Sequence, residues 1–140
     1  MKILATQRCD YAVRAVCFLA SLDGRVANAG EISDETGVPM AALHQLMQSL
    51  SRAQLVSSRT GPRGGYRLSQ DPATISVRDV VEAVEGPIDP GFCELSGMFC
   101  PTASPCALHA VWAKAQQTFR DELGSMSLTC LVTGGQFEVC

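Results

Sequence analysis

Long apolar runs and an excess of basic residues are both missing from this sequence. No stretch is long and apolar enough to span a membrane. The N-terminal residues turn polar at Thr6, Gln7 and Arg8, which predicts that no secretory signal peptide is present. A chain of 140 residues makes one domain, or one domain with an arm. We therefore expect a cytoplasmic protein with a core of its own and no association with a membrane.

Residues suited to catalysis are scarce as well. The chain has only two histidines, His44 and His109, whereas a catalytic cysteine needs a base and an orienting group beside it. The glycine-rich segment 60–65 is not followed by the Lys-Ser/Thr pair of a phosphate-binding loop. Paired carboxylates and an oxyanion-binding loop are not evident. The sequence thus predicts that the protein is not an enzyme.

Cysteine, in contrast, is abundant. Seven cysteines, an odd number, in a chain without an export signal indicate reduced thiols that bind metal or perform redox work. Three of them, Cys93, Cys100 and Cys106, lie in one loop-like stretch, and His109 follows three residues after the last. This pattern predicts a metal or cluster site.

The spacing within the loop bears on the kind of metal. Six residues separate the first two loop cysteines and five separate the next two. Zinc motifs usually place cysteines two to four residues apart, so the longer spacers favour a larger iron–sulfur cluster. Three soft thiolates with a weaker fourth ligand suit a 4Fe-4S cluster, and a 2Fe-2S cluster is an alternative. A structural Cys3His zinc site and a cluster-free thiol sensor also stay open.

The net charge of −3 averages over an uneven distribution. Between residues 40 and 70 the chain carries Arg52, Arg59, Arg63 and Arg67 but no Asp or Glu. One basic surface on an acidic body would bind nucleic acid, although a solvated arginine face would give the same pattern.

The first half of the chain predicts a helix-turn-helix. Residues 9–22 indicate a buried first helix, and helices over 28–37 and 40–53 follow, joined by a turn at Gly37. The second helix of such a pair enters the DNA major groove, where Gln pairs with adenine and Ala methyls contact thymine. Its face opposite the apolar residues carries Ala41, His44, Gln45, Gln48 and Arg52.

A two-stranded wing is predicted directly after that helix. Residues 55–59 and 66–68 read as strands around the glycine-rich segment 60–65. Its glycines would let the backbone approach DNA closely. Arg59, Arg63 and Arg67 are therefore expected to contact phosphates or the minor groove.

The second half of the chain is expected to contain a loop and a long helix. Ser76 and Asp79 predict a capped helix to about residue 84, followed by an irregular loop over 88–105. A helix over 107–124 is favoured as a dimer helix over one packed on its own domain, because it has an apolar seam with three-four spacing, namely Leu108, Trp112, Ala115, Phe119 and Leu123. The predicted divisions are a DNA-binding domain (1–87), a cluster-binding loop (88–106) and a dimerisation helix with a mobile C-terminal tail (107–140). The fold class is mainly α with a small wing.

Together these motifs resemble the winged helix-turn-helix iron–sulfur transcription regulators typified by IscR and NsrR. The resemblance covers about residues 5–132 and rests on the order of the helices, the Gly-Pro-x-Gly-Gly-Tyr wing at 61–66, the Val-Glu-Gly-Pro run at 84–87 and the three-cysteine loop. It implies a homodimer on roughly palindromic operator DNA, with the cluster held by the three cysteines. Some relatives are repressors that release DNA when the cluster is damaged, and others lack a cluster. Nitric oxide or oxygen is the expected signal here, because either can displace a weakly held fourth ligand from the cluster.

The resemblance offers two candidates for the fourth ligand. The segment that contains His109 is similar to the IscR segment, in which the histidine is the ligand. The segment that begins at Asp10 is similar to the NsrR segment, which implies an aspartate that reaches the partner subunit's cluster. The spacers fit NsrR-like members, so Asp10 is preferred, and the neighbouring Cys9 is a rival. Cys9 and Cys17 are otherwise expected in the core.

Overall fold

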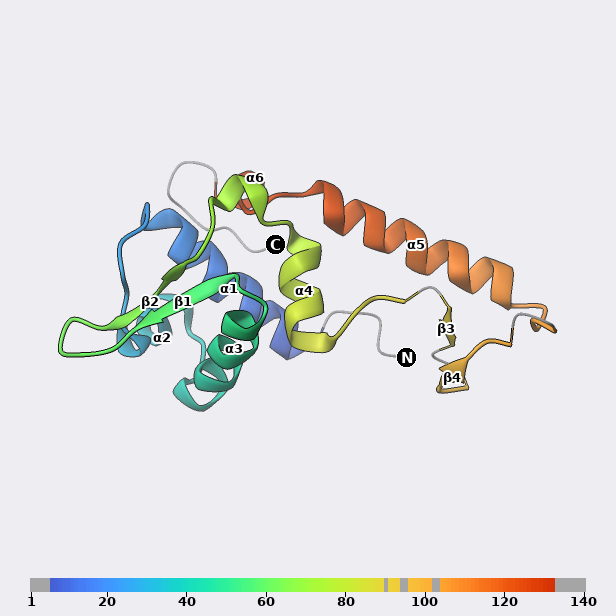
Figure 1. Cartoon of the computed structure of the whole chain (residues 1–140), viewed down its shortest axis with the longest axis horizontal. Helices are drawn as coiled ribbons and strands as arrows, with labels where there is room; N and C mark the ends of the chain where they lie inside the picture. The colour runs from blue at the N-terminus through green and yellow to red at the C-terminus, as the bar shows by residue number, and fades with distance from the viewer. Residues whose placement is uncertain (1–5, 90, 94–95, 102–103, 133–140) are drawn as a thin grey trace.

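The computed structural model describes residues 6–89, 91–93, 96–101 and 104–132, and it is mainly helical, as predicted. Its helices and strands pass from a winged helix-turn-helix to a small hairpin and a long helix (Figure 1). In chain order they are α1 (Gln7–Ser21), α2 (Ala29–Thr36), α3 (Met40–Arg52), β1 (Val56–Arg59), β2 (Gly65–Leu68), the 3-10 helix η1 (Pro72–Thr74), α4 (Val77–Glu85), β3 (Phe92–Cys93), β4 (Met98–Phe99), α5 (His109–Ser125) and α6 (Leu128–Leu131). None of the described helices is long and apolar enough to cross a bilayer.

Helix α1 forms the centre of the core. Thr6 caps it by accepting a hydrogen bond from the Cys9 backbone N–H at 3.2 Å. The helix packs against α2, α3 and α4, and its buried face includes Ala12, Ala15 and Val16. Small residues at these positions let three helices approach α1 closely, which fixes the helix-turn-helix on the body of the protein.

The predicted helix-turn-helix is confirmed in α2 and α3. Asn28 caps α2 by accepting a hydrogen bond from the Glu31 N–H, and Gly37 ends it with a left-handed φ of 70°. Only half of a capping box forms here, because the Glu31 carboxylate binds Arg25 at 2.6 Å and not the Asn28 N–H. Helix α3 buries its predicted apolar face, consisting of Leu43, Leu46, Met47 and Leu50.

The wing is an antiparallel hairpin of β1 and β2, as predicted. Tyr66 adds a bridge outside the predicted strands: its backbone exchanges two hydrogen bonds with Ala27, at 2.7 and 2.9 Å. Gly65 is required at this crossing, since a Cβ atom there would lie 2.2 Å from the Ala27 carbonyl oxygen. The wing is therefore attached to the segment that leads into α2.

Helix α4 begins with the predicted capping box. Ser76 accepts a hydrogen bond from the Asp79 N–H at 3.1 Å, and the Asp79 carboxylate accepts one from the Ser76 N–H at 2.8 Å. The loop after α4 is more regular than predicted, because β3 and β4 pair as a short hairpin. Phe92 and Phe99 face each other edge to face across this hairpin, with ring centroids 5.5 Å apart.

Helix α5 runs along one side of the molecule, and its first turn lies at the far end from the wing (Figure 1). Its other end is fixed by two backbone hydrogen bonds of 2.9 Å, from Val77 to Met126 and from Leu128 to Ile75. The predicted apolar seam divides into two parts. Phe119 and Leu123 pack on the core of the same chain, a packing weighed as the alternative to a dimer helix. Near the first turn, Leu108 of the seam is 56% exposed, and Val111, which lies outside the predicted seam, is 67% exposed.

Candidate functional site

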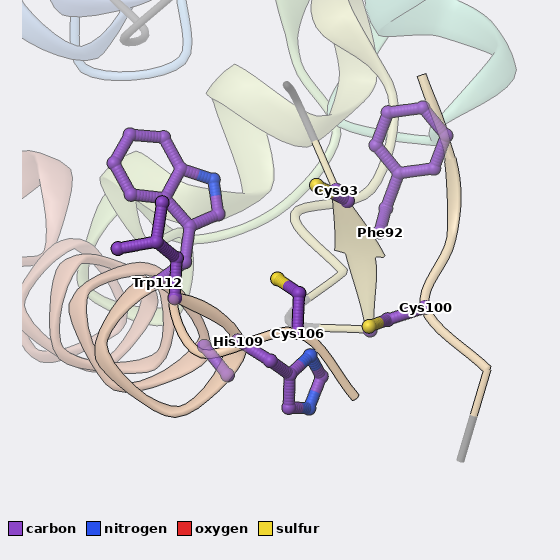
Figure 2. A pocket seen from close by; sticks show the side chains of 9 residues that line it. Phe92, Cys93, Cys100, Cys106, His109 and Trp112 are labelled. Carbon is purple, nitrogen blue, oxygen red and sulfur yellow. The ribbon is translucent and has the colours of Figure 1, made fainter. Parts of the chain in front are cut away.

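Three cysteines meet at one hollow between the β3–β4 hairpin and the start of α5. Cys93 is the last residue of β3, Cys100 follows β4, and Cys106 precedes α5. Figure 2 shows these cysteines together with Phe92, His109 and Trp112, and the Trp112 ring forms the wall on the α5 side. The hollow has a volume of about 300 Å³, part of which is open to solvent. The structure thus brings together residues that span a 17-residue range of the sequence, 93–109.

Backbone hydrogen bonds hold each cysteine in its place. The Gly97 N–H donates to the Cys93 carbonyl at 2.8 Å and closes the turn of the hairpin. Gly97 has a φ of 69°, a left-handed conformation that glycine adopts without strain. The Cys100 N–H donates to Gly91, and the carbonyl of Cys106 accepts from the His109 N–H, both at 3.0 Å. The hairpin and the helix start therefore position the three cysteines.

The donor set suits an iron–sulfur cluster, and the same set also binds structural zinc. Three sulfur atoms and an imidazole are the soft and intermediate donors that iron–sulfur clusters use. Within the described residues, however, no three Cys, His, Asp or Glu side chains converge closely enough to hold one metal ion. The cysteines surround a space instead of a point, and the aromatic side chains of Phe92 and Trp112 line it.

The two candidates for the fourth ligand lie in different places. His109 lines the hollow with the three cysteines. Asp10 does not line it; its Oδ1 lies 3.0 Å from the Nε of Arg14 on the exposed side of α1. Within a single chain, the structure groups only His109 with the cysteines, and a second chain would be needed to supply Asp10.

The cysteines outside the loop have contrasting environments. Cys9 and Cys17 are buried, as predicted. Burial raises the pKa of the Cys17 thiol to about 12 and also raises the pKa of Cys9, near which Glu85 acts in the same direction. Cys130 is exposed, and a hydrogen bond with Ser127 at 3.4 Å lowers its pKa. Cys140 lies outside the described residues, as does the predicted mobile tail.

A second surface is formed by α3 and the wing. The predicted contact residues of α3 are all exposed, namely Ala41, His44, Gln45, Gln48 and Arg52. Arg59, Arg63 and Arg67 are exposed on the wing. Within the described part of the chain, none of these four arginines forms an ion pair or a side-chain hydrogen bond, whereas Arg14 and Arg25 both pair with carboxylates. The arrangement leaves four cations available to an anionic partner.

Comparison with known proteins identifies the family. A family model described as Rrf2, iron-dependent transcriptional regulator, matches residues 5–134. The chain belongs to the Rrf2 family. Its members are DNA-binding transcriptional regulators and not enzymes, which agrees with the prediction from the sequence.

Solved structures of relatives share this fold. CymR of B. subtilis, described as the global cysteine regulator, is 25% identical with a TM-score of 0.76, over 95% of this chain and 97% of its own. IscR of T. potens is 27% identical with a TM-score of 0.74, over 94% of this chain and 88% of its own. The oxidized form of S. aureus CymR is 25% identical with a TM-score of 0.71, over 95% of this chain and 97% of its own.

Two residues that line the hollow of this Rrf2-family protein, Phe92 and Trp112, are not predicted as site residues from the sequence. Phe92 lies next to the first cysteine, and Trp112 lies three residues after His109. Trp112 was assigned to the apolar seam of the helix. The available signal was its position one helical turn after His109, which places both side chains on the same face of α5.

Proposed function

We propose that this Rrf2-family regulator is an iron–sulfur-dependent DNA-binding repressor. The observation that carries the proposal is the hollow at which Cys93, Cys100, Cys106 and His109 meet. These thiols would hold the cluster, 4Fe-4S in preference to 2Fe-2S. When bound, such a cluster supplies redox chemistry and an iron with a replaceable fourth ligand, which is the position open to nitric oxide or oxygen.

The α3–wing surface is proposed to bind operator DNA. The polar face of α3, with His44 and Gln45 in its first turns, has the side chains to read base edges in the major groove. The exposed arginines of the wing would bind phosphates, and Arg63 lies in the turn between its two strands. The acidic net charge is no obstacle, because these cations lie on one surface.

Helix α5 is proposed to connect the hollow with the DNA-binding surface. Its first turn borders the hollow, while residues 126–128, which directly follow its last turn, are hydrogen-bonded to Ile75 and Val77 at the entry to α4. Helix α4 in turn packs against α3. A change in the loop would therefore tilt α5 and shift the population between two dimer geometries, only one of which matches the operator spacing.

The fourth ligand can be identified with two variants. His109 would be the fourth ligand of the cluster held by its own chain, whereas Asp10 would be the fourth ligand of the cluster held by the other chain of a homodimer. We expect the cluster of the variant that lacks the true ligand to be lost soonest on exposure to air, as followed by visible absorbance. Asp10→Ala also removes the partner of Arg14, so Arg14→Ala is the control for a purely structural effect.

Operator binding before and after nitric oxide tests the function. An operator would first be selected from a random duplex library, and binding would be measured anaerobically by fluorescence anisotropy. We expect stoichiometric nitric oxide to weaken binding of the cluster-containing protein about tenfold or more. Unchanged affinity would remove nitric oxide as the signal, and exposure to oxygen would be tested in the same way.

A cluster-free thiol sensor is the second candidate. It is supported by the similarity to S. aureus CymR, whose structure is described as an oxidized form, and by the exposed Cys130 with its lowered pKa. This alternative predicts colourless protein whose DNA affinity changes with hydrogen peroxide and is restored by dithiothreitol. Cys130→Ser would abolish that response.

A further inference from the structure

Trp112 holds a buried hydrogen-bond donor that no described residue accepts from. Its Nε1 is shielded from solvent and has no hydrogen-bond partner among the described residues. A buried N–H without an acceptor costs about 1–3 kcal/mol, so an orphaned group of this kind calls for an explanation. Trp112 lines the same hollow as the three cysteines, and in Figure 2 the nitrogen-bearing edge of its ring is turned toward the cysteine side.

Two other orphaned atoms on α5 provide a comparison. The Oε1 of Gln116 and the Nε of Arg120 are also buried without a partner in the described residues. Neither residue lines the hollow. The other end of the Gln116 amide donates to the Phe92 carbonyl at 3.4 Å, and the Arg120 Nε lies 3.9 Å from a Glu82 oxygen. Trp112 alone of the three directs an unused polar atom at the site.

We propose that Trp112 is a positioning residue whose indole N–H donates a hydrogen bond to a sulfur atom of the bound cluster or of the Cys93 thiolate. This inference rests on the proposed function. The indole N–H is a donor only, so it can bind the electron-rich sulfur but cannot serve as a ligand of iron. Hydrogen bonds to cluster sulfur atoms stabilise the more negative, reduced state and raise the reduction potential.

The variant Trp112→Phe removes the N–H and keeps an aromatic ring on the wall of the hollow. We expect iron and sulfide content to be preserved and the midpoint potential to fall. The reduction equilibrium constant should drop about threefold to tenfold, where a tenfold drop equals about 59 mV for a one-electron couple. Gln116→Leu is the matched control, because it removes an orphaned atom outside the hollow and should leave the potential unchanged.

A second measurement uses the fact that this tryptophan is the only one in the chain. Emission of the wild-type protein should be strongly quenched when the cluster is present and should recover in full when a chelator removes iron. Unquenched emission from cluster-containing protein would overturn the placement of Trp112 beside the cluster. An unchanged potential in Trp112→Phe at full cluster content would overturn the hydrogen bond.

The outcomes separate this inference from the function on which it depends. Wild-type protein without iron and sulfide would refute the proposed function, and the inference with it. If Trp112→Phe loses its cluster, the midpoint potential is measured instead on protein in which Trp112 is replaced by 3-benzothienylalanine. This amino acid has the shape of tryptophan and lacks only the N–H. A lowered potential in that protein supports the hydrogen bond, and an unchanged potential contradicts it.

Discussion

At the scale of single residues, the exposed side chains on α3 and on the wing would have different roles in DNA binding. Gln45 lies on the polar face of α3, and Arg63 lies in the wing turn. Base contacts specify sequence, whereas phosphate contacts contribute affinity to every sequence. The structure therefore predicts different consequences for the loss of each side chain.

Gln45→Ala should reduce the preference for the operator over random DNA about tenfold, because a bidentate contact with adenine contributes about 1–3 kcal/mol of discrimination. Arg63→Ala should weaken binding to both DNAs about equally and reduce the slope of log K against log salt by about one. Anisotropy titrations over a range of salt concentrations measure both effects. Wild-type behaviour of both variants would refute the assignment of this surface, and Gln70→Ala at the base of the wing serves as the neutral control.

The buried thiol of Cys17 predicts a dependence of stability on pH. Its pKa is raised from an ordinary value of 9.0 to about 12 by burial. The folded protein therefore keeps the proton that the unfolded chain releases above pH 9. The free energy of unfolding is therefore unaffected by Cys17 below pH 9. As the pH rises from 9 toward 12, ionisation of Cys17 in the unfolded chain lowers the free energy of unfolding by about 1.4 kcal/mol per pH unit.

Urea unfolding at pH 8, 9.5 and 10.5 measures this loss. The free energy of unfolding should fall more steeply above pH 9 for the wild type than for Cys17→Ala, whose core position cannot ionise. Equal slopes for the two proteins would show that Cys17 ionises normally. Val16→Ala is the matched control, since it removes buried volume from the same helix but no thiol and should leave the wild-type slope in place.

At the scale of elements, the attachment of the wing depends on one close approach. A Cβ atom at Gly65 would collide with the backbone of Ala27 and Asn28. Gly65→Ala should therefore separate β2 from the segment that leads into α2. We expect a loss of about 1–3 kcal/mol of stability and weaker operator binding. Thermal unfolding checks the first effect, and Ser58→Ala on the neighbouring strand, which is exposed, should change neither.

The helices could be predicted from the sequence because their signals are local. The Ser76–Asp79 capping box, the Gly37 helix end and the apolar spacing of α3 depend on residues within one or two turns of each other. The β3–β4 hairpin and the bridge between Ala27 and Tyr66 could not be predicted in this way. Each paired segment is only one or two residues long, which is too short to produce an alternating pattern of apolar and polar residues in the sequence.

The candidate site could be predicted only in part, for a related reason. Cysteine spacing identified three residues that the structure does bring to one hollow. The role of Trp112 and Phe92 depends on how the hairpin packs beside α5, which is a tertiary contact. The choice between His109 and Asp10 depends on a second chain, and a single sequence contains no direct signal for that arrangement.

At the scale of the whole molecule, the exposed apolar residues near the start of α5 predict dimerisation. Leu108, Val111, Met98 and Phe99 are each more than half exposed, and they lie on the hairpin and helix that border the hollow. Burying them against a second copy would remove this apolar surface from water. The dimer interface would then lie next to the hollow, so that a structural change in the hollow would alter the packing at the interface.

Val111→Asp should therefore convert the dimer to a monomer at micromolar concentration and weaken operator binding at least tenfold. Light scattering coupled to size exclusion measures the mass directly. Ala73→Asp, at an exposed apolar position in η1, is the control and should remain a dimer. A dimeric Val111→Asp protein would place the interface elsewhere.

The central claim is that the three loop cysteines hold an iron–sulfur cluster, and metal content tests it most directly. Protein purified anaerobically would be assayed for iron, sulfide and zinc, together with Cys100→Ser and the matched variant Cys130→Ser. We predict brown wild-type and Cys130→Ser proteins with near-equal iron and sulfide, and a colourless or rapidly bleaching Cys100→Ser protein. Wild-type protein that carries a single zinc, or no metal, would contradict the account.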